Sequence, residues 1–133
     1  MIITLDSNVL ISAIVFGGKP RSILELVLEG ECRLALSPAI LAEVAGVLKG
    51  RKFAYPEPAA LAVAKELEAL AHLVYPQVRL KVITEDPADN RILECARESS
   101  SEAIISGDRH LRALKEFKGI PILAPGEFLD RLA

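Results

Sequence analysis

Four of the five aspartates in this chain stand where a strand pattern gives way to a helix pattern. They are Asp6, Asp86, Asp89 and Asp108. Asp6 directly follows the apolar run Ile2–Leu5, and Asp108 follows the run Ala103–Ser106 by two residues. Because the carboxyl ends of parallel strands share one edge of a sheet, these two side chains meet if their strands are neighbours. Asp89 joins them if the helix that it opens begins at the same edge.

Asp6 has no cation near it in the sequence. The first basic residue is Lys19, and the residues around Asp6 are mostly apolar or small. Burying a carboxylate without a partner is costly, so Asp6 must be exposed, hydrogen-bonded or paired with a group from a distant segment.

Helix capping is the alternative explanation for these aspartates. Asp is a preferred N-cap, and a carboxylate suits the positive end of a helix. The run Asp86-Pro-Ala-Asp89 fits an N-cap, a proline at the first helical position and an acid at the third. If Asp6 and Asp108 are also only caps, the chain is a non-catalytic α/β binding module.

Glu43 is the fifth acidic candidate. It flanks the apolar stripe of the expected helix Pro38–Leu48, and a long side chain at that position can reach into a cleft. The other glutamates lie within helical patterns, where a solvated helix face is the expected environment.

Four carboxylates in one cleft require a cation. Two carboxylates about 5 Å apart repel each other by about 3 kcal/mol at an effective dielectric constant of about 20. Oxygen ligands favour Mg²⁺ or Mn²⁺ over zinc, and such an ion activates water and neutralises charge on a phosphoryl group. This chemistry suits the hydrolysis of phosphodiesters. A phosphatase that uses Asp6 as nucleophile is disfavoured, because Asn8 stands where such enzymes usually carry a second aspartate.

Short apolar runs alternate with longer helical patterns along the chain. The expected strands are Ile2–Leu5, Arg33–Leu36, Ala103–Ser106 and Pro121–Leu123, with Leu73–Tyr75 as a weaker fifth. Helices are expected directly after Asp6, from Gly126 onwards, and at Ser22–Leu28, Pro38–Leu48, Ala59–Leu73, Ala88–Glu98 and Arg109–Phe117. This alternation predicts an α/β fold with a mostly parallel sheet that helices cover on both faces.

Length and composition fit a single domain over residues 1–133. The net charge of -2 argues against binding nucleic acid by bulk electrostatics, so such a role would need a local basic patch or metal ions. Cys32 and Cys95 are expected to be reduced thiols. No segment has the length of a membrane span or the basic start of a signal peptide, so we expect a cytoplasmic protein without membrane association.

Four segments, taken together, resemble the PIN-domain nucleases. They are LDSNVLISA, the helix that carries Glu43, EDPADNRILECA and ISGDRHL, in that order. With the closing segment ILAPGEFLDRL, the resemblance covers nearly the whole chain. It is strongest to the VapC-like branch, the toxin components of bacterial toxin–antitoxin systems. Ser7 is a mild departure, since threonine is common at that position.

The resemblance implies a three-layer α/β/α PIN-like domain with a central, mostly parallel sheet of four to five strands. It also implies a Mg²⁺- or Mn²⁺-dependent endoribonuclease in which a metal-activated water attacks an RNA phosphorus. A cognate antitoxin protein and a homodimer are the expected partners besides RNA. By position, the catalytic and metal-binding residues would be Asp6, Glu43, Asp89 and Asp108. The polar residues expected to flank or support them are Asn8, Asp86 and Ser106.

A row of basic residues follows Asp108. Arg109, Arg112, Lys115 and Lys118 repeat every three residues, and on a helix they would form a basic stripe beside the cleft that could hold RNA phosphates. A solvated helix face is the alternative. The two histidines, His72 and His110, are expected to be structural or surface residues rather than catalytic ones.

Overall fold

A six-stranded sheet forms the centre of the computed structural model, which describes residues 1–133. The strands are β1 (Ile2–Leu5), β2 (Arg33–Leu36), β3 (His72–Leu73), β4 (Ala103–Ile105), β5 (Glu116–Phe117) and β6 (Ile120–Leu123). Their order across the sheet is β3-β2-β1-β4-β6-β5, and only β5 runs antiparallel to its neighbour. The sheet is therefore mostly parallel, as predicted, with one short strand more than the sequence indicated.

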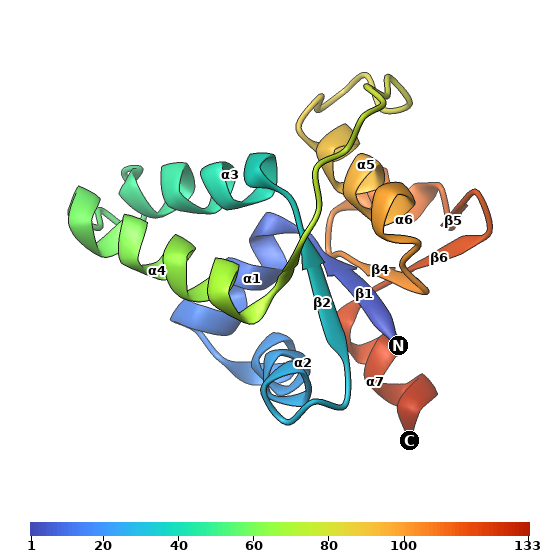
Figure 1. The fold of residues 1–133 in the computed structure, drawn as a ribbon, viewed down its shortest axis with the longest axis horizontal. Coiled ribbons are helices and arrows are strands. Elements are labelled where there is room, and N and C mark those ends of the chain that lie inside the picture. The colour runs from blue at the N-terminus through green and yellow to red at the C-terminus, as the bar shows by residue number, and fades with distance from the viewer.

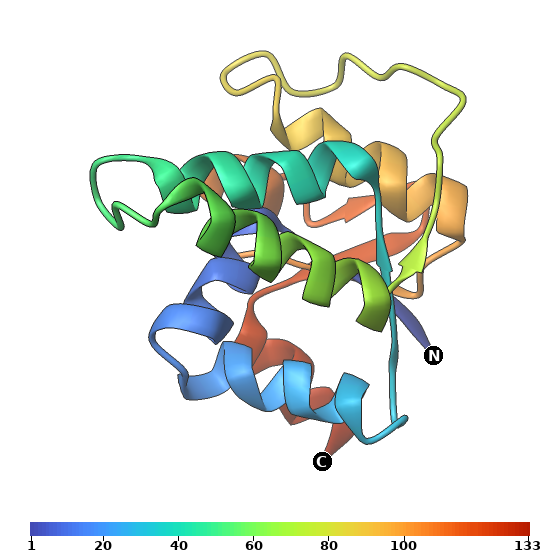
Figure 2. The ribbon, with the colours of Figure 1, turned by 60° about the vertical axis from the view of Figure 1, so that its left-hand side comes forward.

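Seven helices surround this sheet. They are α1 (Ser7–Val15), α2 (Gly18–Leu28), α3 (Pro38–Lys49), α4 (Glu57–Leu70), α5 (Asp89–Ser99), α6 (Arg109–Ala113) and α7 (Pro125–Leu132). Helix α5 packs against β1, β2 and β4, whereas α7 packs against β6 and α2. The sheet lies between α5 and the pair α2 and α7 (Figure 1), and α3 runs alongside α4 (Figure 2). This arrangement confirms the predicted α/β fold class.

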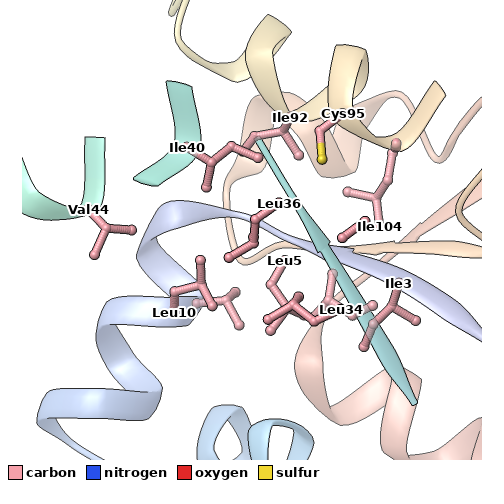
Figure 3. Packing of buried hydrophobic residues seen from close by; sticks show 14 of the residues in the cluster. Ile3, Leu5, Leu10, Leu34, Leu36, Ile40, Val44, Ile92, Cys95 and Ile104 are labelled. Atoms are coloured by element: carbon pink, nitrogen blue, oxygen red, sulfur yellow. The ribbon is translucent and has the colours of Figure 1, made fainter. Parts of the chain in front are cut away.

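Apolar side chains from both the strands and the helices form one core. The central strands β1, β2 and β4 are short and rich in isoleucine and leucine, and most of their residues are buried because helices cover the sheet. Figure 3 shows the strand residues Ile3 and Leu36 and the helix residues Ile40 and Ile92 within one cluster of buried side chains. The core thereby ties α3 and α5 to the central strands, and both helices carry predicted site residues.

The register of β1 and β4 brings two predicted site positions together. Leu5 pairs with Ile105, so Asp6 and Ser106 are the next residues along two adjacent parallel strands. The backbone N–H of Asp6 donates to the carbonyl of Ile105 at 3.1 Å, which extends the pairing to the first residue beyond β1. The carboxyl edge of the sheet therefore begins at this point.

Two predicted helices are shorter than expected. The helix expected over Ala59–Leu73 ends at Leu70, because the chain turns extended and joins the sheet as β3 beside β2. The helix expected over Arg109–Phe117 ends at Ala113, because Phe117 belongs to β5 in a hairpin with β6. Lys118 and Gly119 form the turn of this hairpin with φ of 49° and 81°, the pattern of a tight hairpin turn.

Both cysteines, Cys32 and Cys95, are free, as expected, and both are buried. No helix of the structure combines the length and the apolar character needed to cross a membrane.

Candidate metal centre

Asp6 is a buried carboxylate at the carboxyl end of β1. It is the N-cap of α1, and its Oδ1 accepts a hydrogen bond from the backbone N–H of Val9 at 2.8 Å. Its Oδ2 accepts a hydrogen bond from the hydroxyl of Ser106. Burial raises the pKa of Asp6 to about 6 even though these two donors oppose the rise, and the negative charges of Asp108 and Glu43 add to it. Two hydrogen bonds therefore do not fully compensate the buried charge.

Ser106 links the first and last predicted acids. Besides donating to Asp6, its hydroxyl oxygen accepts a hydrogen bond from the backbone N–H of Asp108 at 2.9 Å. Asp108 is the N-cap of α6, where its Oδ2 accepts from the N–H groups of His110 and Leu111 at 2.8 and 2.9 Å. Capping thus accounts for Oδ2 of Asp108 and leaves Oδ1 for another partner.

Asp89 brings a third carboxylate to the same place. It is the first residue of α5, it is half-buried, and its Oδ2 is a buried atom without a hydrogen-bond partner. Burial, the charge of Asp108 and a hydrogen bond with the Asp108 carboxyl raise the pKa of Asp89 to about 7, with smaller contributions from the charges of Asp86 and Asp6. An orphaned carboxylate oxygen in an acidic environment is unfavourable unless a cation or a proton binds there.

The predicted cap at Asp86 is wrong in its detail. Helix α5 begins at Asp89 with Ala88 at the N-cap, so Asp86 is not the N-cap and Asp89 is not at the third helical position. Asp86 instead precedes the helix in a turn, where its Oδ1 accepts from the N–H of Ala88 at 3.1 Å. It is exposed, and it acts on Asp89 through its charge.

Glu43 approaches the cluster from another helix. Ser37 caps α3 directly after β2, and Glu43 lies on the second turn of this helix with a half-buried side chain. Its charge contributes to the raised pKa of Asp6, which places it within electrostatic range of the buried carboxylate. Asn8, by contrast, is exposed on the first turn of α1, and its side chain makes no hydrogen bond within the chain.

His110 lies in the acidic cluster, which sequence reasoning missed. One ligand atom from each of Asp89, Asp108 and His110 lies within 4.8 Å of the others. The Nδ1 atom of His110 is buried and has no hydrogen-bond partner. The expectation that His110 is a structural or surface residue rather than a catalytic one stays a prediction. The place of His110 two residues after Asp108, in the first turn of a helix capped by that residue, was the available signal.

A row of polar side chains along α5 holds the chain segment that precedes Asp89. Sequence reasoning missed this row too. Asn90 accepts from the N–H groups of Val82 and Ile83 and donates to the carbonyl of Ile83. Glu94 accepts from the N–H of Leu80 and pairs with Arg91, and Glu98 accepts from the N–H of Gln77. The i, i+4, i+8 spacing puts these three side chains on one face, where they hold the long segment after β3. Glu94 is buried, so a solvated face was the wrong expectation for it.

The four basic residues after Asp108 are exposed but do not share one helix. Arg109 and Arg112 lie on α6, whereas Lys115 and Lys118 follow it in the turn and the hairpin. The prediction that these four residues form a stripe along one helix is therefore wrong. Arg112 also contacts Glu127 of α7 at 3.4 Å. RNA binding by these residues stays a prediction.

The donor set of the cluster fits a divalent ion. Asp6, Glu43, Asp89 and Asp108 supply carboxylate oxygens from four different segments, and no Lys or Arg side chain pairs with any of them. The orphaned oxygen of Asp89 and the raised pKa values of Asp6 and Asp89 are the effects that a bound cation would relieve.

Comparison with known protein families identifies the family of this chain. The model of the PIN domain family matches residues 3–110. The chain belongs to the PIN domain family. The match begins in β1 and ends at His110, so the PIN domain includes every acid of the cluster. No curated protein sequence is similar enough to the chain to count as a relative.

Two solved structures share the fold of this PIN domain. One is VapBC2 from Rickettsia felis bound to a DNA fragment from its promoter, with a TM-score of 0.63 and 16% identity over 92% of this chain and 97% of that one. The other is VapBC-1 from nontypeable Haemophilus influenzae, with a TM-score of 0.64 and 14% identity over 95% of this chain and 99% of that one. The sequences are so distant that the likeness shows the fold alone.

Proposed function

We propose that this PIN domain is a metal-dependent endoribonuclease that hydrolyses RNA phosphodiester bonds. Two observations support the proposal: ligand atoms of Asp89 and Asp108 lie within 4.8 Å of each other, and the charges of Asp108 and Glu43 act on the buried Asp6 carboxylate. Ligands bind at the carboxyl edge of open α/β sheets, and an all-carboxylate cluster suits Mg²⁺ or Mn²⁺. Helix capping is a real role of Asp6 and Asp108, but it explains neither Glu43 nor the orphaned oxygen of Asp89.

In this proposal the chain's own groups have separate roles. When bound, the divalent ion supplies a water of lowered pKa and neutralises charge on the phosphate. Asp6, Asp89 and Asp108 would hold the ion, and Glu43 would add a fourth carboxylate from α3. Ser106 orients Asp6 and Asp108 through its two hydrogen bonds, and the contacts of α5 to the segment before it orient Asp89.

A nuclease assay with matched variants tests the proposal. Purified protein with Mn²⁺ or Mg²⁺ should cleave RNA, and EDTA should abolish cleavage. Asp6→Asn and Asp89→Asn should lower the rate at least about 100-fold while circular dichroism shows an unchanged fold. Asp130→Asn is the control, because Asp130 is exposed on α7 and outside the cluster. Equal cleavage by wild type and Asp6→Asn would reveal a contaminating nuclease and remove the support for the proposal.

We further propose that the enzyme is the toxin of a toxin–antitoxin pair. Two solved structures with this fold are VapBC assemblies, and this likeness supports the proposal together with the PIN family membership. Expression in bacteria should arrest growth, and Asp6→Asn should relieve the arrest. A small DNA-binding protein encoded immediately upstream should co-purify with the chain and restore growth. Growth unaffected by the active nuclease would contradict the toxin role but not the chemistry.

A homodimer stays a prediction, which light scattering on the purified chain can test.

A further inference from the structure

His110 is the one residue of the cluster that offers a nitrogen atom instead of a carboxylate oxygen. The proposed function gives no role to its imidazole. Its Nδ1 is a buried atom with no hydrogen-bond partner, although the side chain as a whole is 31% exposed. The Oδ2 of Asp89 is orphaned in the same way. Ligand atoms of these two residues and Asp108 lie within 4.8 Å of one another. The cluster thus contains two buried atoms without hydrogen-bond partners, one imidazole nitrogen and one carboxylate oxygen, and the Nδ1 of His110 lies 4.0 Å from Oδ2 of Asp108.

We propose that His110 donates a nitrogen ligand to the metal ion of this site and that this ligand makes the site select Mn²⁺ over Mg²⁺. The inference rests on the proposed function only in taking the acidic cleft as a metal site. Mg²⁺ demands oxygen ligands in near-ideal octahedral geometry and gives up its water reluctantly. Mn²⁺ belongs to the transition-metal series that binds mixed nitrogen and oxygen sites, so an imidazole changes the balance in its favour.

The spacing of the three ligand atoms suits this role. In octahedral coordination with bonds of about 2.1 Å, two ligands at right angles lie about 3 Å apart and two on opposite sides lie about 4.2 Å apart. Ligand atoms that lie within 4.8 Å of one another therefore require a contraction of up to about 1.8 Å. Asp89 and His110 are only half-buried, and rotation of their side chains can supply it.

The backbone around His110 supports the same geometry. Asp108 is fixed by the N–H groups of His110 and Leu111, both of which donate to Oδ2. The other carboxylate oxygen, Oδ1, stays available for an ion. Because His110 and Asp108 sit in the same helical turn, the cap that holds the carboxylate also places the imidazole beside it.

Metal titration of the full chain tests the inference. EDTA-stripped protein is titrated by calorimetry with MnCl₂ and separately with MgCl₂, using wild type, His110→Ala and His110→Asn. His110→Ala should raise the Kd for Mn²⁺ at least about tenfold, because loss of an outer-shell partner alone typically costs 10- to 100-fold in affinity. The Kd for Mg²⁺ should change less than about twofold. His110→Asn puts an oxygen near the Nδ1 position and should keep Mg²⁺ binding while losing the Mn²⁺ preference.

The only other histidine of the chain is the matched control. His72 is exposed on the edge strand β3, which β2 and β1 separate from β4, and His72→Ala should bind both ions like wild type. Pulsed EPR of the Mn²⁺-loaded protein should detect the coupling of a directly bound imidazole nitrogen, and this signal should vanish in His110→Ala and persist in His72→Ala. Circular dichroism melting separates loss of the ligand from loss of the fold.

Three outcomes would overturn the inference. They are an unchanged ratio of the Mn²⁺ and Mg²⁺ affinities in His110→Ala, a nitrogen signal that survives this substitution, and a wild-type protein without preference for Mn²⁺. None of these results touches the proposed nuclease activity, which is tested by Asp6→Asn. If Asp6→Asn still cleaves RNA while His110→Ala loses Mn²⁺ selectively, the metal site stands and the assigned chemistry fails.

Discussion

Replacing Asp6 by asparagine should make the metal-free protein more stable at pH 8 while abolishing its activity. Asn is nearly as good an N-cap as Asp, so the hydrogen bond from the N–H of Val9 can be kept. The substitution removes the charge whose burial raises the pKa of Asp6 to about 6. A stabilising change at a proposed catalytic position is the signature of a residue retained for function.

The pKa of Asp6 sets the size of this effect. Its rise from 3.8 to about 6 is about two units, and each unit corresponds to about 1.4 kcal/mol. The ionised Asp6 therefore costs the folded state about 3 kcal/mol above pH 7. Asn faces the hydroxyl of Ser106 with an amide instead of a carboxylate, and reversing that hydrogen bond costs about 1 kcal/mol. The net gain is about 2 kcal/mol, or an increase in Tm of about 6 to 10 °C for a chain of this length.

The effect should depend on pH in a defined window. Because the pKa of Asp6 is higher in the folded than in the unfolded state, the folded state binds more protons between pH 3.8 and about 6. In the wild type, the contribution of Asp6 to the free energy of unfolding is fully present below pH 3.8 and is lost as the pH rises through about 6. The stability difference between Asp6→Asn and wild type should be smallest near pH 4, should grow between pH 4 and 6, and should level off above pH 7.

Urea unfolding in EDTA at several pH values measures this difference, with Asp130→Asn as the control for removing an exposed acid. Mn²⁺ at 100 times its Kd should add about 2.7 kcal/mol to the wild type and much less to Asp6→Asn, so the order of stability should reverse. The reasoning is refuted if Asp6→Asn is less stable than wild type at pH 8 in EDTA, or if the difference does not change with pH.

Three further substitutions test other parts of the site. Ser106→Ala removes a donor to the Asp6 carboxylate, so carboxyl ¹³C NMR in EDTA should find the pKa of Asp6 about one to two units higher; an unchanged value would contradict the role of Ser106. Asn90→Ala leaves two backbone N–H groups and one carbonyl without partners and should lower the free energy of unfolding by about 2 to 4 kcal/mol in urea titrations. Arg109→Ala should weaken binding of single-stranded RNA to EDTA-treated protein and lower the salt slope by about 0.7, whereas Arg131→Ala on α7 should leave both unchanged.

The elements that carry the acids were predictable because they are locally encoded. A run of β-branched and leucine residues bounded by polar ones defines each of β1, β2, β4 and β6, within one residue of the structure. Ser37 followed by Pro38 defines the start of α3 by the same local rules that apply in any helix. The likeness of four short motifs to PIN-domain nucleases then indicated the family to which the chain belongs.

Elements shaped by distant partners were not predictable in the same way. The helical pattern continues past Leu70 and Ala113, yet the chain leaves the helix at both points because a neighbouring strand offers backbone hydrogen bonds. Strand β5 has only two residues and exists through its pairing with β6. Such pairing depends on which segments meet in space, and no local pattern records it.

The sequence by itself determined which residue types stand at the ends of the strands, and hence that carboxylates rather than cysteines or histidines would dominate any site. Only the tertiary structure decided how those carboxylates are held. The order β2-β1-β4 makes Asp6 and Ser106 neighbours. The packing of α5 on these strands brings Asp89 to the same edge of the sheet, and the packing of α3 on α1 and α5 brings the charge of Glu43 within range of Asp6. The pKa of a carboxylate depends on burial and on charges that come from other segments, so the raised pKa of Asp6 and the unpartnered imidazole of His110 emerge only once those segments are assembled.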